Sequence, residues 1–339
     1  MVAVNPVGLD IGSTAIRAVE TSRGRDRPII TRFGQVDLPA GVVQAGVITD
    51  PGAVTTALRH VWATTRFHTR DVVLGVTNPQ VVVRAMEVAN LPPRELKQSL
   101  PFQVRDALPL PVERSILDFY PLEVPGDAET VRGLLIAAPK EAVLIAVRAA
   151  EQAGLRVVRV DLASFALLRA VSHLDDQVEA LVDIGAMATS VLIHADGEPL
   201  IVRTIPRGGM AVSEMIATRL AISVPEAETL KCRVGLDDED DPDTAEVVRE
   251  AVRPLINEIR SSFAYLTSGD RPVRVTRLVL SGGGSLLRGL VQAMSTQLAI
   301  STVLADPMSR LRPHRSKADP QRLGSTAAIS IGLTMGASV

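Results

Sequence analysis

The chain has 339 residues and a formal net charge of −2, so it is long enough to bury a sizeable core and to form two domains. Hydrophobic residues make up 46% of it and charged residues 22%, a balance that excludes intrinsic disorder and favours a folded globular protein. The small net charge and the 3% content of aromatic residues argue against nucleic acid as a partner. Cys232 is the only cysteine, so no disulfide can form within the chain.

The first predicted element is a β-hairpin over residues 7–20. An apolar run ends in Asp10-Ile11-Gly12, a small polar turn spans residues 12–14, and a second apolar run follows. Gly12 can adopt a positive φ angle and has no side chain, so the turn can aim backbone N–H groups at an anion. Asp10 stands at the entrance to the turn, where a carboxylate can hold Mg²⁺ through water.

The next part of the chain predicts further strands and one helix. Asp50 can cap this helix, and Pro51 suits its first position, because the N–H that proline lacks has no helical partner there. The patterns predict a strand over 29–38, a loop over 39–50, a helix over 52–65, and strands over 72–76 and 81–88.

The middle of the chain predicts a compact α+β insertion over residues 89–160. Its apolar residues have two interpretations: at helical spacing they usually fill a core, but Phe102, Leu108 and Phe119 could also line a partner-binding groove. The predicted parts are a helical stretch over 96–111 that Pro101 interrupts, paired strands over 117–122 and 131–138, a helix over 140–153 closed by Gly154, and a strand over 156–160.

A second hairpin repeats the plan of the first. After a linking helix over 161–171, an apolar strand again ends in Asp183-Ile184-Gly185, and a small turn and another apolar strand follow. Two such hairpins far apart in one chain predict two similar halves that face each other across a nucleotide. Each turn would hold the phosphates from its own side, and Asp10 and Asp183 would share the metal ion.

Two further stretches fit the same site. Glu228 and Lys231 share one face of a helix over 225–231, either at the site or as a solvated surface ion pair. A strand, a glycine run at Gly282-Gly283-Gly284 and a helix follow over 277–290, where the glycines admit a ligand close to the backbone and the helix N-terminus favours negative groups. The other segments are a helix over 208–221, a solvated acidic loop over 237–243, a long helix over 244–266 despite Pro254, a basic loop over 308–322, and a buried terminal helix over 324–339 that is too short to cross a membrane.

These stretches, in this order, resemble the actin-like ATPase superfamily. The correspondence is to its first phosphate motif at residues 10–14, its second at 183–189 and its adenosine motif at 281–285, and the helix over 227–231 resembles the one that contacts ribose and base. Within the superfamily the chain resembles the PilM family of type IV pilus assembly proteins and, more distantly, the cell-division protein FtsA. The middle of the chain, with Pro101, Gln103 and the strand Asp118-Phe119-Tyr120, carries the most specific part of the resemblance.

The resemblance implies an actin-like α/β fold with two similar domains around a nucleotide cleft. Residues 1–190 would form the first domain, with 89–160 inserted, residues 191–323 the second, and 324–339 a helix that returns to the first. ATP and Mg²⁺ are the implied cofactors, with Asp10 and Asp183 on the metal through water. The implied nucleotide-binding residues are Asp10, Gly12, Ser13, Thr14, Arg17, Asp183, Gly185, Ala186, Thr189, Glu228, Lys231, Gly282, Gly283, Gly284 and Ser285. Arg17 stands where the family often has lysine.

The implied function is that of a cytoplasmic, ATP-binding component of type IV pilus assembly. It would reach the inner membrane only indirectly, by binding the N-terminal tail of a PilN-like protein in a groove beside the insertion, where Gln103 and Arg105 suit an extended peptide. Other platform proteins are further expected partners, and self-association is a further expectation.

Three alternatives stay open. The first is a nucleotide-binding scaffold in which ATP hydrolysis is weak or absent, because no residue can be assigned to orient the attacking water. A small-molecule kinase of the same superfamily needs a positioned base, and no carboxylate can be assigned to that role. An FtsA-like cell-division scaffold ends in a basic amphipathic helix, whereas residues 324–339 lack the Lys and Arg face that such a helix requires.

Overall fold

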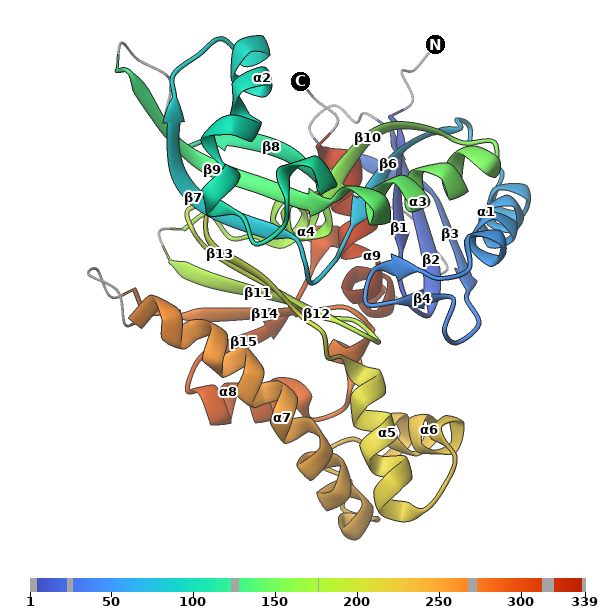
Figure 1. Cartoon of the computed structure of the whole chain (residues 1–339). Helices are drawn as coiled ribbons and strands as arrows, with labels where there is room; N and C mark the ends of the chain where they lie inside the picture. Colours follow the sequence, from blue (N-terminus) through green and yellow to red (C-terminus); the bar gives the residue numbers. More distant parts are fainter. Residues whose placement is uncertain are drawn as a thin grey trace.

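Two five-stranded sheets form the centres of the two halves of the molecule (Figure 1). The computed structural model describes residues 5–22, 27–122, 128–175, 177–267, 273–312 and 320–336. The strand order is β10-β6-β1-β2-β3 in the first sheet and β13-β12-β11-β14-β15 in the second. Each sheet has three consecutive antiparallel strands, which begin with the hairpin, and two further strands parallel to the first of them, so the two sheets match strand for strand, as the repeated hairpins predict.

The first half packs two helices on one face of its sheet. The side chain of Asp50 accepts a hydrogen bond from the N–H of Ala53, which confirms the predicted cap of α1. Its elements are β1 (Val7–Ile11), β2 (Ala15–Ser22), β3 (Ile29–Asp37), β4 (Val43–Gln44), β5 (Val47–Ile48), α1 (Pro51–Thr65), β6 (Asp71–Val76), α3 (Lys140–Gln152) and β10 (Arg156–Leu162). The loop predicted over 39–50 therefore contains a short hairpin, β4–β5.

The insertion is a three-stranded sheet with one helix, and it is shorter than predicted. It comprises β7 (Val82–Ala89), α2 (Pro93–Gln103), η1 (Arg105–Ala107), η2 (Val112–Arg114), β8 (Ser115–Pro121) and β9 (Thr130–Pro139), with the strand order β7-β9-β8. The predicted span of 89–160 is wrong at both ends, because it leaves out nearly all of β7, which pairs with β9, and includes α3 and β10. Ala149 and Ala150 of α3 pack into the core of the first half, and β10 pairs in parallel with β6. The sheet topology therefore limits the insertion to about residues 82–139.

The second half begins at β11, earlier than the predicted boundary at residue 191. Because β11 pairs with β12 and β14, a boundary at 190 would cut the second sheet. Its elements are β11 (Val178–Ile184), β12 (Thr189–Ala195), β13 (Glu198–Ile205), α5 (Gly209–Leu220), α6 (Val224–Val234), α7 (Pro242–Thr267), β14 (Arg277–Ser281), η3 (Gly283–Leu286), α8 (Leu290–Leu298) and β15 (Ser301–Leu304). The long helix α7 forms despite Pro254, as expected.

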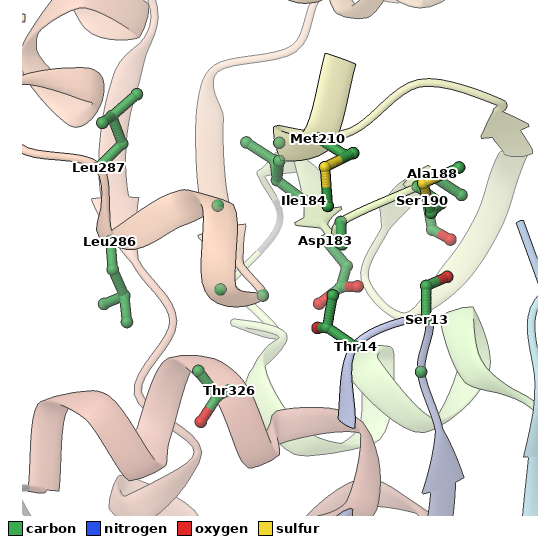
Figure 2. A pocket seen from close by; sticks show the side chains of 18 of the residues that line it. Ser13, Thr14, Asp183, Ile184, Ala188, Ser190, Met210, Leu286, Leu287 and Thr326 are labelled. Atoms are coloured by element: carbon green, nitrogen blue, oxygen red, sulfur yellow. The ribbon is translucent and has the colours of Figure 1, made fainter. Parts of the chain in front are cut away.

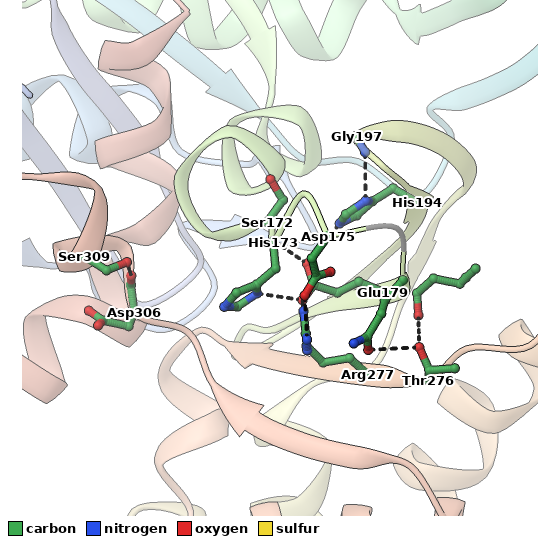
Figure 3. Close-up of polar contacts among 12 residues, drawn as sticks. Ser172, His173, Asp175, Glu179, His194, Gly197, Thr276, Arg277, Asp306 and Ser309 are labelled. Carbon is green, nitrogen blue, oxygen red and sulfur yellow. Dashed lines mark hydrogen bonds and ion pairs between the residues drawn. The ribbon is translucent and has the colours of Figure 1, made fainter.

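A buried glutamate fixes the start of the second sheet (Figure 3). Glu179 accepts hydrogen bonds from Nε2 of His194 at 3.0 Å and from the backbone N–H of His173 at 2.9 Å, and Arg277 lies 3.4 Å away. Burial alone would raise the pKa of Glu179, but these hydrogen bonds hold it below the usual value. The carboxylate thus ties β11 to β12 and β14 at the end of β11 that lies away from Asp183.

Two helices lie between the halves, α4 (Ala163–Val171) and α9 (Pro320–Met335) (Figure 1). α9 packs on β1, β2 and α4, so its described residues contact the first half, where the terminal helix was expected. The contacts are close, because a Cβ atom at Gly332 would lie 1.8 Å from the carbonyl oxygen of Ala166, and one at Gly8 would lie 2.0 Å from that of Ser330.

The segment before α9 was predicted to be a basic loop over 308–322. The structure has η4 (Pro307–Arg310) at the start of this segment and α9 from Pro320, and residues 313–319 lie outside the described residues. Residues 337–339, at the C-terminus, also lie outside them. Within the described ranges no helix combines the length and the apolar character that crossing a membrane requires.

Candidate functional site

A cleft of about 870 Å³ lies between the two halves, at the ends of β1, β11 and β14 (Figure 2). Both Asp-Ile-Gly turns and the glycine run line it. Figure 2 shows Ser13 and Thr14 of the first turn close to Asp183 of the second hairpin. Three stretches that are far apart in the sequence therefore meet at one site.

Most of the predicted site residues line this cleft. They are Asp10, Gly12, Ser13, Thr14, Arg17, Asp183, Gly185, Ala186, Glu228, Lys231, Gly282, Gly283 and Gly284. Thr189 and Ser285 are buried and do not line it. The Thr189 hydroxyl donates to the carbonyl of Arg207 at 2.8 Å, and the Ser285 hydroxyl donates to that of Gly282 at 2.7 Å. Both hydroxyls therefore stabilise backbone segments next to the cleft and are not directed into it.

The two turns have the same geometry. The N–H of Gly12 donates to the carbonyl of Ala15 at 3.0 Å, and the N–H of Gly185 donates to that of Ala188 at 2.9 Å. Neither glycine has a positive φ angle, so the expectation that Gly12 uses one is wrong. A Cβ atom at either position would instead lie about 3 Å from the carbonyl oxygen that closes its turn, which favours glycine by close approach.

Two carboxylates share the floor of the cleft. Asp10 is the second-last residue of β1 and Asp183 the second-last of β11, and both are half-buried. Burial raises the pKa of both groups, and burial together with the negative charge of Asp10 raises the pKa of Asp183 to about 6. The positive charge of Arg17 offsets part of the rise in both. Two crowded carboxylates of this kind favour a cation between them.

A hydrated Mg²⁺ fits this donor set. Within the described ranges no group of three or more His, Cys, Asp and Glu side chains comes together as a metal cage. Mg²⁺ does not need one, because it keeps several of its waters and binds through one or two carboxylates together with phosphate oxygens. Asp10 and Asp183 supply the carboxylates.

Lys231 is buried, so the interpretation of Glu228 and Lys231 as a solvated surface pair is wrong. The Lys231 ammonium group donates to Glu228 at 2.7 Å, to the hydroxyl of Ser213 at 2.9 Å and to the carbonyl of Gly209 at 3.0 Å. These contacts use its three donors and hold α6 against the start of α5. Burial alone would raise the pKa of Glu228, but the hydrogen bonds from Lys231 and Ser213 lower it. The carboxylate stays ionised on the cleft wall, where it can accept hydrogen bonds.

The glycine run packs against the second hairpin. Gly282 has a φ of +81°, and a Cβ atom there would lie 2.5 Å from the carbonyl oxygen of Ile184. A Cβ atom at Gly284 would lie 2.4 Å from the side chain of Ile184, whereas one at Gly283 would meet nothing within 4 Å. The predicted helix after the run is wrong in detail, because the run itself enters the single turn η3 at Gly283 and α8 begins only at Leu290.

Sequence reasoning missed several lining residues. In the first half these are Phe33, Gln35, Gly46 and Thr77, and α9 adds Thr326 and Ile329. The other half adds the apolar residues Met210, Val252, Leu255, Leu286, Leu287 and Leu290. Figure 2 shows Leu286 and Leu287 away from Asp183, where they give the cleft an apolar end. The last three of these apolar residues lie in the stretch over 277–290, whereas the other residues belong to no local motif and reach the cleft through tertiary packing. The apolar end suits the faces of a flat ring such as a nucleobase.

Comparison with known proteins decides the family. Residues 8–337 match the family described as type IV pilus assembly protein PilM. The chain belongs to the PilM family. A solved PilM–PilN type IV pilus biogenesis complex contains a chain of similar structure, with 27% identity, a TM-score of 0.86 and 98% of each chain covered. The PilM family lies in the actin-like ATPase superfamily, so the predicted family and fold class are both confirmed.

Two other proteins resemble this PilM-family chain, one in part of its sequence and one in its fold. The FtsA cell-division protein of Rhizobium meliloti is 27% identical over 162 residues, which span 40% of this chain and 36% of that protein. MreB5 of Spiroplasma citri, solved with AMPPNP, has a TM-score of 0.55 at 14% identity, over 97% of this chain and 94% of that one. At that identity the likeness extends to the fold alone.

The closeness of Asp10 and Asp183 should lower the stability of the ligand-free protein toward unfolding. The pKa of Asp183 is higher in the folded chain than the ordinary value of 3.8, so the folded state binds the proton more tightly. Stability of the ligand-free protein should therefore fall as the pH rises between about 4 and 6. The Asp183→Asn variant should not show this loss. At pH 7.5 its free energy of unfolding should exceed that of the wild type by about 2 kcal/mol, a figure reduced because solvent screens the half-buried group, and at pH 4 the two should be similar.

Urea unfolding of both proteins at the two pH values, without Mg²⁺ or nucleotide, measures this difference. The Asp240→Asn variant, in the exposed acidic loop, is the control. A gain for Asp183→Asn that is the same at both pH values would contradict the crowding of the two carboxylates.

Proposed function

We propose that this chain binds ATP with Mg²⁺ in the cleft between its two halves. The meeting of two Asp-Ile-Gly turns and the glycine run in one cleft, with Asp10 and Asp183 crowded at its floor, is the observation that carries the proposal. A nucleotide in the MreB5 structure shows that the fold accommodates such a ligand in another protein.

Each part of the cleft has a distinct role in this proposal. Asp10 and Asp183 hold the hydrated Mg²⁺, which neutralises part of the phosphate charge. The two turns approach the phosphates from opposite sides, and Arg17 adds a positive charge on the first side. The ionised carboxylate of Glu228 accepts hydrogen bonds from the ribose hydroxyls, and the apolar end of the cleft holds the base.

Binding, more than turnover, is the proposed activity. The carboxylates at the floor of the cleft are the two proposed for the metal, and Glu228 lies on the far helix α6 beside Lys231. The third lining carboxylate, Glu228, already accepts hydrogen bonds from Lys231 and Ser213, and among the described residues no histidine lines the cleft to act as a base on water. We therefore infer weak or absent ATP hydrolysis.

Removing one metal carboxylate should separate binding from folding. The Asp10→Ala variant should fold normally and lose about tenfold or more of its Mg²⁺-dependent affinity for ATP, because half of the protein's metal donors are gone. Isothermal titration calorimetry with ATP, with and without Mg²⁺, measures this change, with Asp240→Ala as the folded control. An unchanged affinity in folded Asp10→Ala would show that the metal role is wrong.

We further propose that the chain binds the N-terminal tail of a PilN-like membrane protein through its insertion. The PilM–PilN complex gives the precedent in a relative with 27% identity. The insertion exposes Phe102 on α2, with 75% of its surface accessible, and Ile116 and Tyr120 on β8. Exposed apolar side chains of this size, on adjacent elements of one subdomain, favour a peptide partner.

Some of the residues that were expected to contact this partner are buried in the insertion, and others are exposed. Leu108 and Phe119 pack on the buried core of the insertion, so the core interpretation holds for them, but Phe102 is exposed. Gln103 is an internal link, because its side chain accepts from the N–H of Ala89 and donates to Ser99. Arg105 remains exposed, and it is available to a peptide.

The partner surface can be tested with a matched pair of variants. Phe102→Ser should weaken co-sedimentation with vesicles that carry a PilN-like tail by about tenfold or more, because anchoring apolar side chains dominate such contacts. It should leave ATP affinity unchanged. Leu174→Ser removes a comparably exposed side chain, 58% accessible, from the segment between α4 and β11, outside the insertion, and should bind like the wild type. Equal sedimentation of the wild type with bare vesicles would contradict the adaptor role.

A further inference from the structure

Three polar side chains form a row across the first sheet, at the edge of the cleft. The strand register pairs Asp10 of β1 with Arg17 of β2, and Arg17 with Gln35 of β3. Directly opposed residues on neighbouring strands point to the same face of a sheet. All three side chains line the cleft. Gln35 therefore belongs to the site, although it lies outside both Asp-Ile-Gly turns.

The Arg17 guanidinium is held from one side only. Its Nε donates to Oε1 of Gln35 at 3.2 Å. Its Nη1 reaches the first turn, since a Cβ atom at Gly12 would lie 3.9 Å from it. Among the described residues, the bond to Gln35 is the only hydrogen bond of the Arg17 side chain, and no ion pair joins Arg17 to a carboxylate. The Nη edge is left for a ligand at the turn.

The absence of an Arg17 ion pair from the described contacts needs a cause, because both aspartates are near. Arg17 lies directly opposite Asp10 in the strand register, and Asp183 lines the same cleft. Arginine and carboxylate otherwise form strong bidentate pairs. Gln35 supplies a neutral acceptor on the side of Arg17 opposite Asp10, and the carboxamide is itself oriented by donation to Asp37 at 3.4 Å.

We propose that Gln35 is a positioning residue for Arg17. It holds the guanidinium away from the two aspartates and keeps its Nη edge at the first turn, where the phosphates of a nucleotide would lie. Without this acceptor the guanidinium folds onto the carboxylates, which blocks the metal donors and removes a phosphate contact. This inference rests on the proposed nucleotide function, because the role of Gln35 is defined by the phosphates.

A double-mutant cycle tests the proposal. Mg²⁺–ATP and adenosine are titrated into the wild type, Gln35→Leu, Arg17→Met and the double variant, with Gln44→Leu, at an exposed position of β4 that does not line the cleft, as the control. Gln35→Leu should lower Mg²⁺–ATP affinity by about threefold to tenfold and Arg17→Met by about tenfold or more, while the double variant should match Arg17→Met alone. Adenosine affinity should stay unchanged throughout, whereas general damage to the cleft would lower it.

Two results would overturn the role of Gln35. In one, Gln35→Leu binds Mg²⁺–ATP as tightly as the wild type. In the other, it costs as much in the Arg17→Met background as it does alone, so that Gln35 acts independently of Arg17. Failure of the wild type itself to bind Mg²⁺–ATP is a different result, which would overturn the nucleotide function and this inference together.

Discussion

The close packing of α9 against the first half, and its hydrogen bonds to the second, set the geometry of the cleft. Gly8 and Gly332 bring α9 into contact with the backbone of β1 and α4, where a larger residue would clash. At the other end of the helix, the carbonyl of Ser325 accepts from the N–H of Gly282 at 2.8 Å and from the hydroxyl of Ser281 at 3.0 Å. The glycine run is thus tied to the helix that packs on the first hairpin.

The cleft brings two negatively charged carboxylates close together, which destabilises the folded chain. Burial raises the pKa of Asp10 and Asp183, and stability is lost when both ionise. Sites that bind ligands often carry such a cost, because the same groups are stabilised once the ligand arrives. The nearest cation, Arg17, is bonded to the neutral Gln35, which leaves the carboxylates for a metal ion.

Sequence patterns predicted the local features well, because the determinants of those features are local. Both hairpins follow from Asp-Ile-Gly after an apolar run, and the cap of α1 follows from Asp50 and Pro51. The extent of the insertion was mispredicted because the partner of β10 is β6, about eighty residues earlier in the chain. The burial of Lys231 depends on Gly209 and Ser213 of α5, which spacing within α6 cannot reveal. Gln35 carries no motif, and only the strand register brings it to Arg17.

The central claim is that one nucleotide is held from both halves at once. Hydrogen–deuterium exchange, measured with and without Mg²⁺–ATP, tests it directly, because a ligand that binds backbone amides slows their exchange. The account predicts slower exchange at residues 12–14, 185–188 and 282–284 together, with no change in the insertion over 82–139. Slower exchange at the turns of one half alone, or at none of the three segments, would contradict it.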